Sequence, residues 1–199
     1  GGKYVTVNGN GAIGLFDGEL GGKNAYAYTT LDYSKYWTAV KDDAPILTSF
    51  AENVEEVSGT SLVNTNWYDV AGKEFDIDTA EELRGFALLS RIHNFQGQKT
   101  NLVKDVKLAE GIDWEPIGKH VDAAKNTVGQ IFAGTFNGNG HTISGLTMEL
   151  TGNEVAYGLF GQVTGTVNNL VLKDAYIGGK ATSAIGTVAG DLLGGATVS

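Results

Sequence analysis

The sequence contains no cysteine among its 199 residues, and only two prolines and one methionine. Without cysteine, neither a disulfide framework nor a thiolate metal site can form. Basic residues are also scarce, because 14 lysines and arginines stand against 23 acidic residues, a formal net charge of −9. This balance argues against nucleic acid or an anionic membrane surface as the partner, since both attract basic proteins.

Long hydrophobic runs are absent as well. No apolar stretch approaches the roughly 20 residues that a membrane-spanning helix needs, and the first residues do not have the pattern of a secretory signal peptide. We therefore expect no membrane insertion, and we expect any export signal to lie outside this sequence. The length allows one or two domains with a sizeable core.

Glycine, in contrast, is abundant, with 29 residues. It gathers with asparagine in segments such as residues 137–140 (Asn-Gly-Asn-Gly), where the backbone can take positive φ at little steric cost. Between such corners lie segments rich in β-branched residues, where apolar side chains alternate with Thr, Ser and Asn: residues 142–148, 166–172 and 197–198. Short strands joined by tight corners favour an all-β fold over helical repeats.

A repeated aromatic position indicates how these strands are arranged. Phe136, in Gly-Thr-Phe, is matched 24 residues later by Phe160, in Gly-Leu-Phe. A weaker version of this motif follows at residues 185–190. Repetition at this period predicts a β-solenoid, in which each turn pairs with the next and buries its inward side chains in one stack. We assign Phe136 and Phe160 to that interior. A hairpin at Asn-Gly remains the alternative.

These residues also resemble a known family. Residues 136–146 (Phe-Asn-Gly-Asn-Gly-His-Thr-Ile-Ser-Gly-Leu), followed by Gly-Leu-Phe-Gly at 158–161, are similar to the GLUG-motif repeats of bacterial surface and adhesin-like proteins. Immunoglobulin A-cleaving metallopeptidases carry such repeats in their non-catalytic parts. The upstream segments 76–87, 104–108 and 113–118 resemble the lead-in to these repeats, so the likeness covers about residues 66–199. It implies a right-handed parallel β-helix on a secreted or surface-attached bacterial protein and no particular activity.

The domain organisation predicted from these patterns has three parts. Residues 1–50 would be the end of a preceding solenoid block, because Gly-Leu-Phe-Asp-Gly at 14–18 resembles the later motif. Within it, residues 36–47 would form a closing strand pair, with a turn at Asp42-Asp43 and with Pro45 on an edge strand. Residues 51–65 would be a linker. Residues 66–199 would be the main block, with its turns at about 102–199.

One helix is expected near residues 79–92. In Thr-Ala-Glu-Glu the Thr79 hydroxyl can accept from the third helical amide while Glu82 reaches back to the Thr79 amide, which is a capping box. Leu83, Phe86 and the apolar residues that follow then share one helical face. We expect this short amphipathic helix to cap the open end of the solenoid.

The sequence has no recognisable catalytic or metal-binding pattern. His93, His120 and His141 form no pair at metal-ligand spacing, and neither a His-Glu-x-x-His run nor a calcium-binding glycine repeat occurs. The densest group of carboxylates comprises Asp76, Asp78, Glu81 and Glu82. A helix N-terminus favours acidic side chains, so we prefer capping to a cation site here and expect no cofactor.

Aromatic side chains are the candidates for ligand contact. Parallel β-helices often bind polysaccharide along a lateral groove, and the stacking faces for sugars would come from Trp37, Trp67, Tyr68 and Trp114, with Tyr36 and Tyr157 as weaker candidates. The alternative is that these rings pack over a turn or under a loop, since Trp and Tyr bury large areas and their polar tips find partners.

Three functions follow from these observations. The preferred one is a non-catalytic structural and adhesive module, extracellular or on the cell surface, that presents a face to a glycan or a host protein. The second is a polysaccharide lyase or hydrolase of the β-helix type, which would need two or three carboxylates that converge on one face. Asp174 and Asp191 are the only aspartates after residue 132, and they lie at different offsets from the repeated Gly-Leu-Phe-Gly position. The third is the non-catalytic domain of a secreted peptidase.

Overall fold

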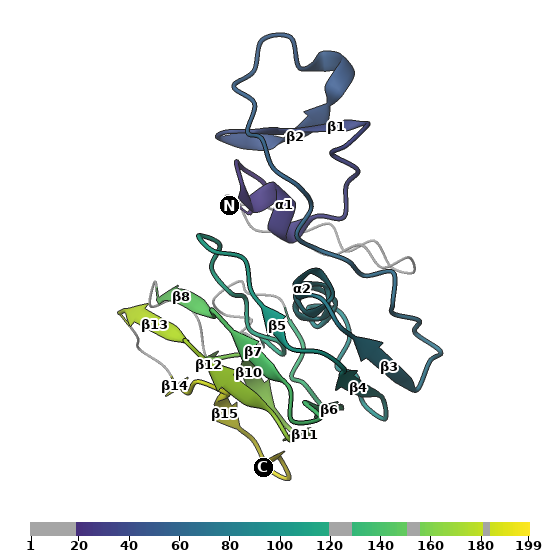
Figure 1. The fold of residues 1–199 in the computed structure, drawn as a ribbon, viewed down its shortest axis with the longest axis vertical. Helices are drawn as coiled ribbons and strands as arrows, with labels where there is room; N and C mark the ends of the chain where they lie inside the picture. Colours follow the sequence, from purple (N-terminus) through teal and green to yellow (C-terminus); the bar gives the residue numbers. More distant parts are fainter. Residues whose placement is uncertain (1–18, 120–128, 151–155, 181–183) are drawn as a thin grey trace.

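The computed structural model of the chain describes residues 19–119, 129–150, 156–180 and 184–199. These residues form a β-solenoid of about four turns with parallel sheets and little helix (Figure 1). An antiparallel strand pair near the N-terminus lies apart from the solenoid, at the top of the figure. The predicted β-solenoid is therefore confirmed.

The largest sheet has five parallel strands, one from each successive pass of the chain. Its spatial order is β16-β11-β6-β4-β3. The strands are β3 (Glu74–Ile77), β4 (Lys99–Leu102), β6 (Thr135–Asn137), β11 (Thr166–Asn168) and β16 (Thr197–Val198). Each pairs in parallel with its neighbour, which excludes the alternative of Asn-Gly hairpins between them.

Four smaller parallel sheets complete the turns. They pair β12 with β7 and β5, β13 with β8, β14 with β9, and β15 with β10. Their bounds are β5 (Val106–Lys107), β7 (Thr142–Ser144), β8 (Thr147–Leu150), β9 (Ala156–Tyr157), β10 (Phe160–Val163), β12 (Val171–Lys173), β13 (Tyr176–Gly179), β14 (Ala184–Ile185) and β15 (Ala189–Leu192).

The strand register corrects the repeat length predicted above. Phe136 lies opposite Val167, and Val167 lies opposite Val198, so one turn spans 31 residues here. Phe160 belongs to another sheet, where it lies opposite Ala189. Phe136 and Phe160 are therefore not equivalent positions 24 residues apart, because each occupies a different side of the coil.

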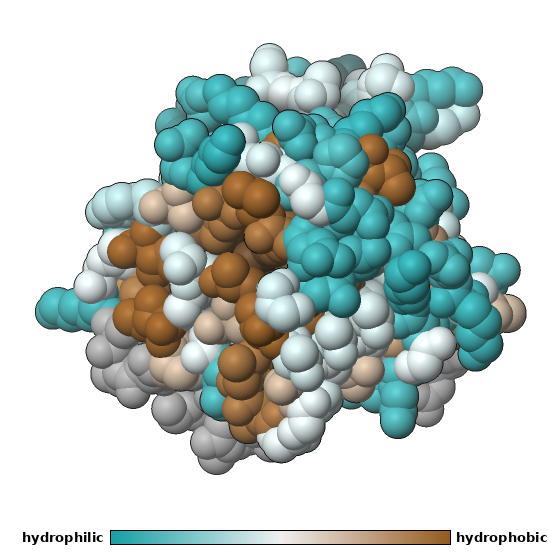
Figure 2. Space-filling view, turned by 60° about the horizontal axis from the view of Figure 1, so that its bottom comes forward, coloured by the Kyte–Doolittle hydropathy of each residue, from teal (hydrophilic) through white to brown (hydrophobic). Residues whose placement is uncertain are grey.

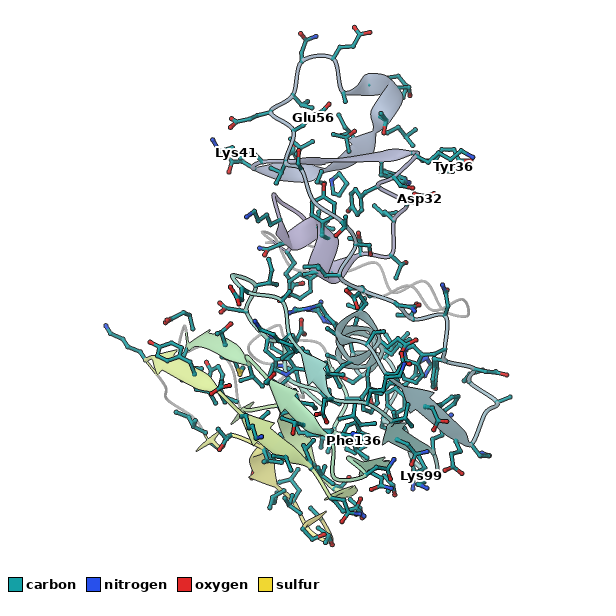
Figure 3. All side chains as sticks on the ribbon, in the orientation of Figure 1. Asp32, Tyr36, Lys41, Glu56, Lys99 and Phe136 are labelled. Carbon is teal, nitrogen blue, oxygen red and sulfur yellow. The ribbon has the colours of Figure 1, made fainter. Side chains whose placement is uncertain are left out.

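The interior assignment of these two rings is nevertheless confirmed. Both are 0% exposed, and their ring centroids lie 5.4 Å apart in an edge-on arrangement. Figure 3 shows Phe136 among the strands and Lys99 at the margin of the solenoid. The buried residues around them form one hydrophobic core that runs through the turns from β3 to β11.

The predicted Asn-Gly corners join strands of successive turns. Asn139 has φ of 51° and the next residue, Gly140, has φ of 79°. A Cβ at Gly138 would lie 2.5 Å from the backbone oxygen of Asn169, the corner of the following turn. The corners are stacked so closely that glycine is required at this point.

The predicted helix is α2 (Ala80–Leu89), shorter at its C-terminal end than the expected 79–92. The Thr79 hydroxyl accepts a hydrogen bond from the Glu82 amide at 3.2 Å. The Glu82 carboxylate accepts from the Asp78 amide at 2.9 Å rather than from the Thr79 amide, so half of the capping box differs by one residue. Leu83 and Phe86 are fully buried and join α2 to the solenoid core.

The N-terminal part contains α1 (Asn24–Tyr28), β1 (Trp37–Val40), β2 (Asp43–Leu47) and the 3-10 turn η1 (Thr48–Phe50). The predicted strand pair is confirmed as antiparallel, but Asp43 already lies opposite Val40, so the turn is at Lys41-Asp42. Figure 3 shows Lys41 and Tyr36 at opposite ends of this hairpin.

The segment predicted as a linker, residues 51–65, has no helix or strand but is not detached: it forms an isolated bridge between Glu56 and Val40, and its Leu62 amide donates to the Tyr26 oxygen at 2.7 Å. The echo motif at residues 14–18 lies outside the described residues, and the three-part division of the chain stays a prediction. No helix in the described part is long and apolar enough to cross a membrane.

Candidate functional site

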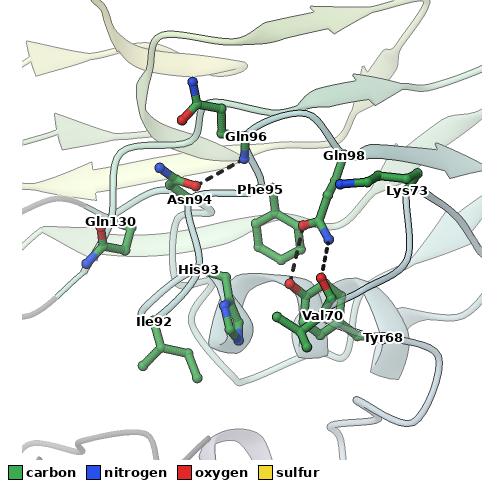
Figure 4. Close-up of a pocket in the computed structure, with 10 residues that line it drawn as sticks. All are labelled: Tyr68, Val70, Lys73, Ile92, His93, Asn94, Phe95, Gln96, Gln98 and Gln130. Carbon is green, nitrogen blue, oxygen red and sulfur yellow. Dashed lines mark hydrogen bonds between the residues drawn. The ribbon is translucent and has the colours of Figure 1, made fainter. Parts of the chain in front are cut away.

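A polar cleft of about 370 Å³ opens between the loop that follows α2 and the segment that precedes β3. Figure 4 shows side chains from both segments around it. Its lining combines aromatic rings with side-chain amides: Tyr68, Val70, Lys73, Ile92, His93, Asn94, Phe95, Gln96, Gln98 and Gln130. No acidic residue is among these lining residues.

Tyr68 and Gln98 form the fixed side of the cleft. The Tyr68 hydroxyl donates to the Gln98 side-chain oxygen at 3.2 Å. The Gln98 side-chain nitrogen in turn donates to the backbone oxygens of Val70 at 3.3 Å and Gly72 at 2.9 Å. The amide of Gln98 is thereby held in one orientation, and it holds the Tyr68 ring in place.

Three rings meet at the floor of the cleft. Tyr68 lies 5.1 Å from His93 and 5.2 Å from Phe95, measured between ring centroids. Phe95 is buried, whereas Tyr68 and His93 are half-buried and keep part of their surface toward the cleft. Burial lowers the pKa of His93 and so favours the neutral imidazole.

The loop that carries these residues has an unusual backbone. Phe95 has φ of 59°, a conformation that a bulky residue adopts only when its surroundings enforce it. The next turn does so: the Ala133 amide donates to the Asn94 oxygen at 2.7 Å, and a Cβ on Gly134 would come within 2.7 Å of the Phe95 oxygen. The glycine lets the two segments approach closely enough for this hydrogen bond.

A buried ion pair anchors the end of α2 from which this loop starts. The Arg91 Nε donates to a Glu115 oxygen at 2.8 Å and Arg91 Nη1 donates to Glu19 at 2.9 Å. The Arg91 side chain is 1% exposed and that of Glu115 is 6% exposed. Burial alone would raise the pKa of Glu115, but Arg91 and Lys119 outweigh burial and hold that pKa below its usual range.

The predicted stacking residues have different environments. Trp114 is 3% exposed and its indole nitrogen donates to the Leu159 oxygen at 3.0 Å, so it presents no ring face to a ligand. Trp67 donates to the Asn64 oxygen at 3.0 Å and packs edge-on against Phe75 and Phe86. Of the four candidates, only Tyr68 lines the cleft.

The remaining aromatic candidates lie away from the cleft. Trp37 is half-buried on β1, opposite Leu47. Tyr36 is 52% exposed beside it, with the Lys35 ammonium 4.6 Å from its ring centroid. Tyr157 is 2% exposed inside the solenoid. The structure thus divides the predicted residues between the core, the hairpin and the cleft.

The acidic and histidine residues form no metal site in the described part of the chain. Asp78 pairs with Lys104, and Glu82 caps α2. His141 Nδ1 lies 3.2 Å from an oxygen of Asp105, whose pKa is lowered by hydrogen bonds from the Thr142 amide and from His141. His120 lies outside the described residues.

Asp174 and Asp191, the aspartates considered for a hydrolase or lyase, lie in different parts of the last turn. Asp174 stands at the corner between β12 and β13 with φ of 51°. Asp191 lies in β15 and accepts from the Gln162 side chain at 3.1 Å. Both aspartates have a structural explanation at their positions, one as a corner residue and one as a hydrogen-bond partner.

Comparison with known proteins gives a single distant relationship. No protein-family model matches the chain, so the GLUG resemblance has no support from that side, and no solved structure matches it. Over 175 residues the chain is 29% identical to halomucin of Haloquadratum walsbyi. The match covers 85% of this chain but only 2% of halomucin, so the chain spans a small fraction of that relative.

The sequence alone identified one residue of this cleft, Tyr68, as a ligand candidate. It did not identify Gln98, Asn94 or Gln96, because an isolated amide in a loop has no distinguishing pattern. A usable signal was the cluster His93-Asn-Phe-Gln-Gly-Gln98, which places amides and rings together directly after the predicted helix.

Proposed function

We propose that this chain is a non-catalytic structural and adhesive module of an extracellular protein, and that the cleft beside α2 binds a glycan. The observation that carries the proposal is the lining of the cleft, where Tyr68 and His93 lie next to several side-chain amides and no carboxylate. Sugars offer hydroxyls for amides and weakly polar ring faces for aromatic side chains.

The fixed geometry of the cleft supports binding. Gln98 is locked by three hydrogen bonds and the loop is held by the next turn, so little conformational entropy is lost when a ligand is bound. The lining also argues against turnover, because glycoside hydrolysis uses a pair of carboxylates that flank the scissile bond.

The extracellular location is supported by the similarity to halomucin. It is also consistent with the composition, since the excess of acidic residues keeps a chain soluble and repels anionic surfaces. A β-solenoid serves as a stiff spacer, because every turn is bonded along its length to the next one. The bacterial origin and the host partner implied by the GLUG resemblance belong to this proposal as well.

The test is binding of the 199-residue chain to a panel of immobilised polysaccharides, with reducing ends and unsaturated products assayed in parallel. We expect weak binding to at least one polysaccharide and no depolymerisation. Tyr68→Ala should weaken that binding by up to about tenfold, since an aromatic contact contributes up to about 1.5 kcal/mol. Gln96→Ala, a change at an exposed position of the cleft, should weaken binding without affecting the fold.

The matched control is Tyr36→Ala, which removes an exposed tyrosine of the hairpin instead. It should leave glycan binding unchanged, and circular dichroism should show that all three variants are folded. Binding that depends on Tyr36 and not on Tyr68 or Gln96 would overturn the assignment of the cleft. Depolymerisation by the pure protein would overturn the non-catalytic function and favour the lyase or hydrolase.

A further inference from the structure

The cleft beside α2 has a local charge opposite to that of the whole chain. The chain carries a formal net charge of −9, yet the residues that line the cleft include Lys73 and no carboxylate. A negatively charged group inside the cleft would therefore meet a positive charge at short range, where the attraction between charges is strongest. The charge of the lining thus bears on which glycans the cleft can accept.

The start of β3 directs Lys73 and the neighbouring acidic residue to opposite sides. Lys73 already belongs to the extended run, because the Lys99 amide donates to its backbone oxygen at 2.8 Å. Successive side chains of an extended run point to opposite faces. Glu74 lies on the outer face, where its carboxylate accepts from Lys99 Nζ at 2.8 Å and from the Asn101 side chain at 3.0 Å. Lys73 lies on the other side, in the lining of the cleft.

Lys73 has no acidic partner among the described residues. Five other lysines pair with carboxylates: Lys41, Lys99, Lys104, Lys107 and Lys119. Asp69, which follows Tyr68 in the chain, does not line the cleft, and its carboxylate accepts from the Ala71 amide at 2.9 Å. Figure 4 shows the Lys73 side chain extended toward Gln98. Its ammonium is therefore available to a ligand in the cleft.

Internal hydrogen bonds already use two side-chain oxygens of the cleft. The Gln98 oxygen accepts from the Tyr68 hydroxyl at 3.2 Å, and the Asn94 oxygen accepts from the Gln96 amide at 3.0 Å. Asn94 consequently keeps its side-chain nitrogen, a donor, for a ligand. A carboxylate or a sulfate only accepts hydrogen bonds, so it matches the ammonium of Lys73 and the amide nitrogen of Asn94.

The surroundings of the cleft are polar as well. Figure 2, turned about the horizontal axis from Figure 1, shows hydrophilic residues predominating on the right-hand side, where β3 lies in Figure 1. The hydrophobic residues visible in that view gather farther to the left. A charged ligand at the β3 side would therefore keep much of its hydration outside the cleft, which lowers the cost of binding it.

We propose that the cleft prefers an acidic glycan, one in which a sugar carries a carboxylate or a sulfate that pairs with Lys73. This preference rests on the glycan function proposed above and adds the charge of the ligand to it. Tyr68 and His93 contact the sugar ring, whereas Lys73 recognises the charge, so affinity and discrimination come from different side chains. Because Lys73 is exposed, its ion pair should change the affinity by no more than about fivefold.

The test is a titration of the 199-residue chain, followed by NMR, with two matched pairs of short oligosaccharides. One pair is trigalacturonate and its methyl ester; the other is a sulfated galactan trisaccharide and its desulfated form. Short ligands avoid the avidity of a polymer. We expect the charged member of at least one pair to bind about three- to fivefold more tightly than the neutral member. The pair that shows the preference distinguishes carboxylate from sulfate.

Substitutions at residue 73 test the source of the preference. Lys73→Met should abolish it and leave the affinity for the neutral member unchanged. Lys73→Arg should retain it, and Lys73→Glu should reverse it in favour of the neutral member. The matched control is Lys107→Met, which removes the same charge from an exposed lysine of β5 and should leave the preference unchanged.

Three outcomes would overturn the preference. The first is equal affinity for charged and neutral members, with Tyr68→Ala weakening both; the glycan site itself would then stand. The second is a preference that survives Lys73→Met or is lost in Lys107→Met. The third is an absence of binding to both charged oligosaccharides. The glycan function is decided separately, by the polysaccharide panel described above.

Discussion

At the first end of the solenoid Phe75 is 8% exposed, whereas at the last end Val198 is 40% exposed, although both side chains belong to the inward row of the same sheet. The difference lies in what covers them. Trp67 and α2 lie over the first end, and no described residue covers the last one. A turn of a solenoid is apolar on its inner surface regardless of its position, so the exposed fraction of an inward side chain depends on what packs over it.

The two ends also differ in how they are held. The closed end is fastened by buried polar groups, among them the ion pair between Arg91 and Glu115. The last turn has apolar side chains and backbone edges without such groups. We therefore expect substitutions at the closed end to cost more stability than equivalent substitutions in the last turn.

Arg91→Met should lower the free energy of unfolding by about 3–5 kcal/mol, because it leaves buried Glu115 without its main counter-charge. Urea denaturation would measure the loss. The control is Lys99→Met, which breaks an exposed pair with Glu74 and should cost less than about 1 kcal/mol. Equal losses in the two variants would show that the closed end is not fastened by this pair.

Val167→Ala and Val198→Ala make the same change at one register position in successive turns. The first should cost about 2 kcal/mol because it opens a cavity in the core, and the second less than about 1 kcal/mol in dilute protein because Val198 is partly solvated. Urea denaturation of both variants measures the difference. Similar values would mean that Val198 is packed as tightly as Val167.

Thr79→Ala should lower the free energy of unfolding by about 1 kcal/mol, since it removes the hydroxyl that caps α2. Thr79→Ser keeps the hydroxyl and should retain most of the stability. Thermal unfolding followed by circular dichroism would distinguish them. A serine variant as unstable as the alanine variant would place the cost in the lost methyl group rather than in the cap.

Mild acidification should have the smallest effect. The pKa of Glu115 is lower in the folded chain than in the unfolded one. The stability that this carboxylate contributes is therefore fully present above its unfolded pKa, about 4.3. That stability is lost as the pH falls through the folded pKa. We expect little change between pH 7 and about 5 and a decline below that. Glu115→Gln should show a shallower decline in urea denaturation at each pH; an identical decline would assign the acid sensitivity to other carboxylates.

Several features of the fold could be predicted because their causes are local. Thr79 and Glu82 mark the start of α2 within four residues, and the Asn-Gly segments mark the corners because few residues tolerate positive φ. Alternating β-branched segments mark the strands. The repeat length could not be read in this way, since Phe136 and Phe160 match as motifs but lie in different sheets.

Of the residues that line the cleft, only Tyr68 was predicted as a ligand contact, because the cleft also depends on residues far apart in the sequence. Tyr68 is conspicuous as an aromatic residue, but the Gln98 that orients it comes 30 residues later. β3 and α2, which lie between them in the sequence, bring the two side chains together. No local sequence pattern indicates that residues 30 positions apart are in contact. Trp114 is the opposite case. It was also predicted as a ligand contact, but its ring is buried under the turns.

Local sequence patterns account for the building elements of this protein: short strands, glycine and asparagine corners, the capped helix α2 and an interior of apolar side chains. These depend on backbone sterics and on hydrogen bonds between near neighbours. The register between turns and the rings that line the cleft became visible only in the folded chain. Those outcomes depend on the register between segments about 30 residues apart, which is fixed when the turns pack.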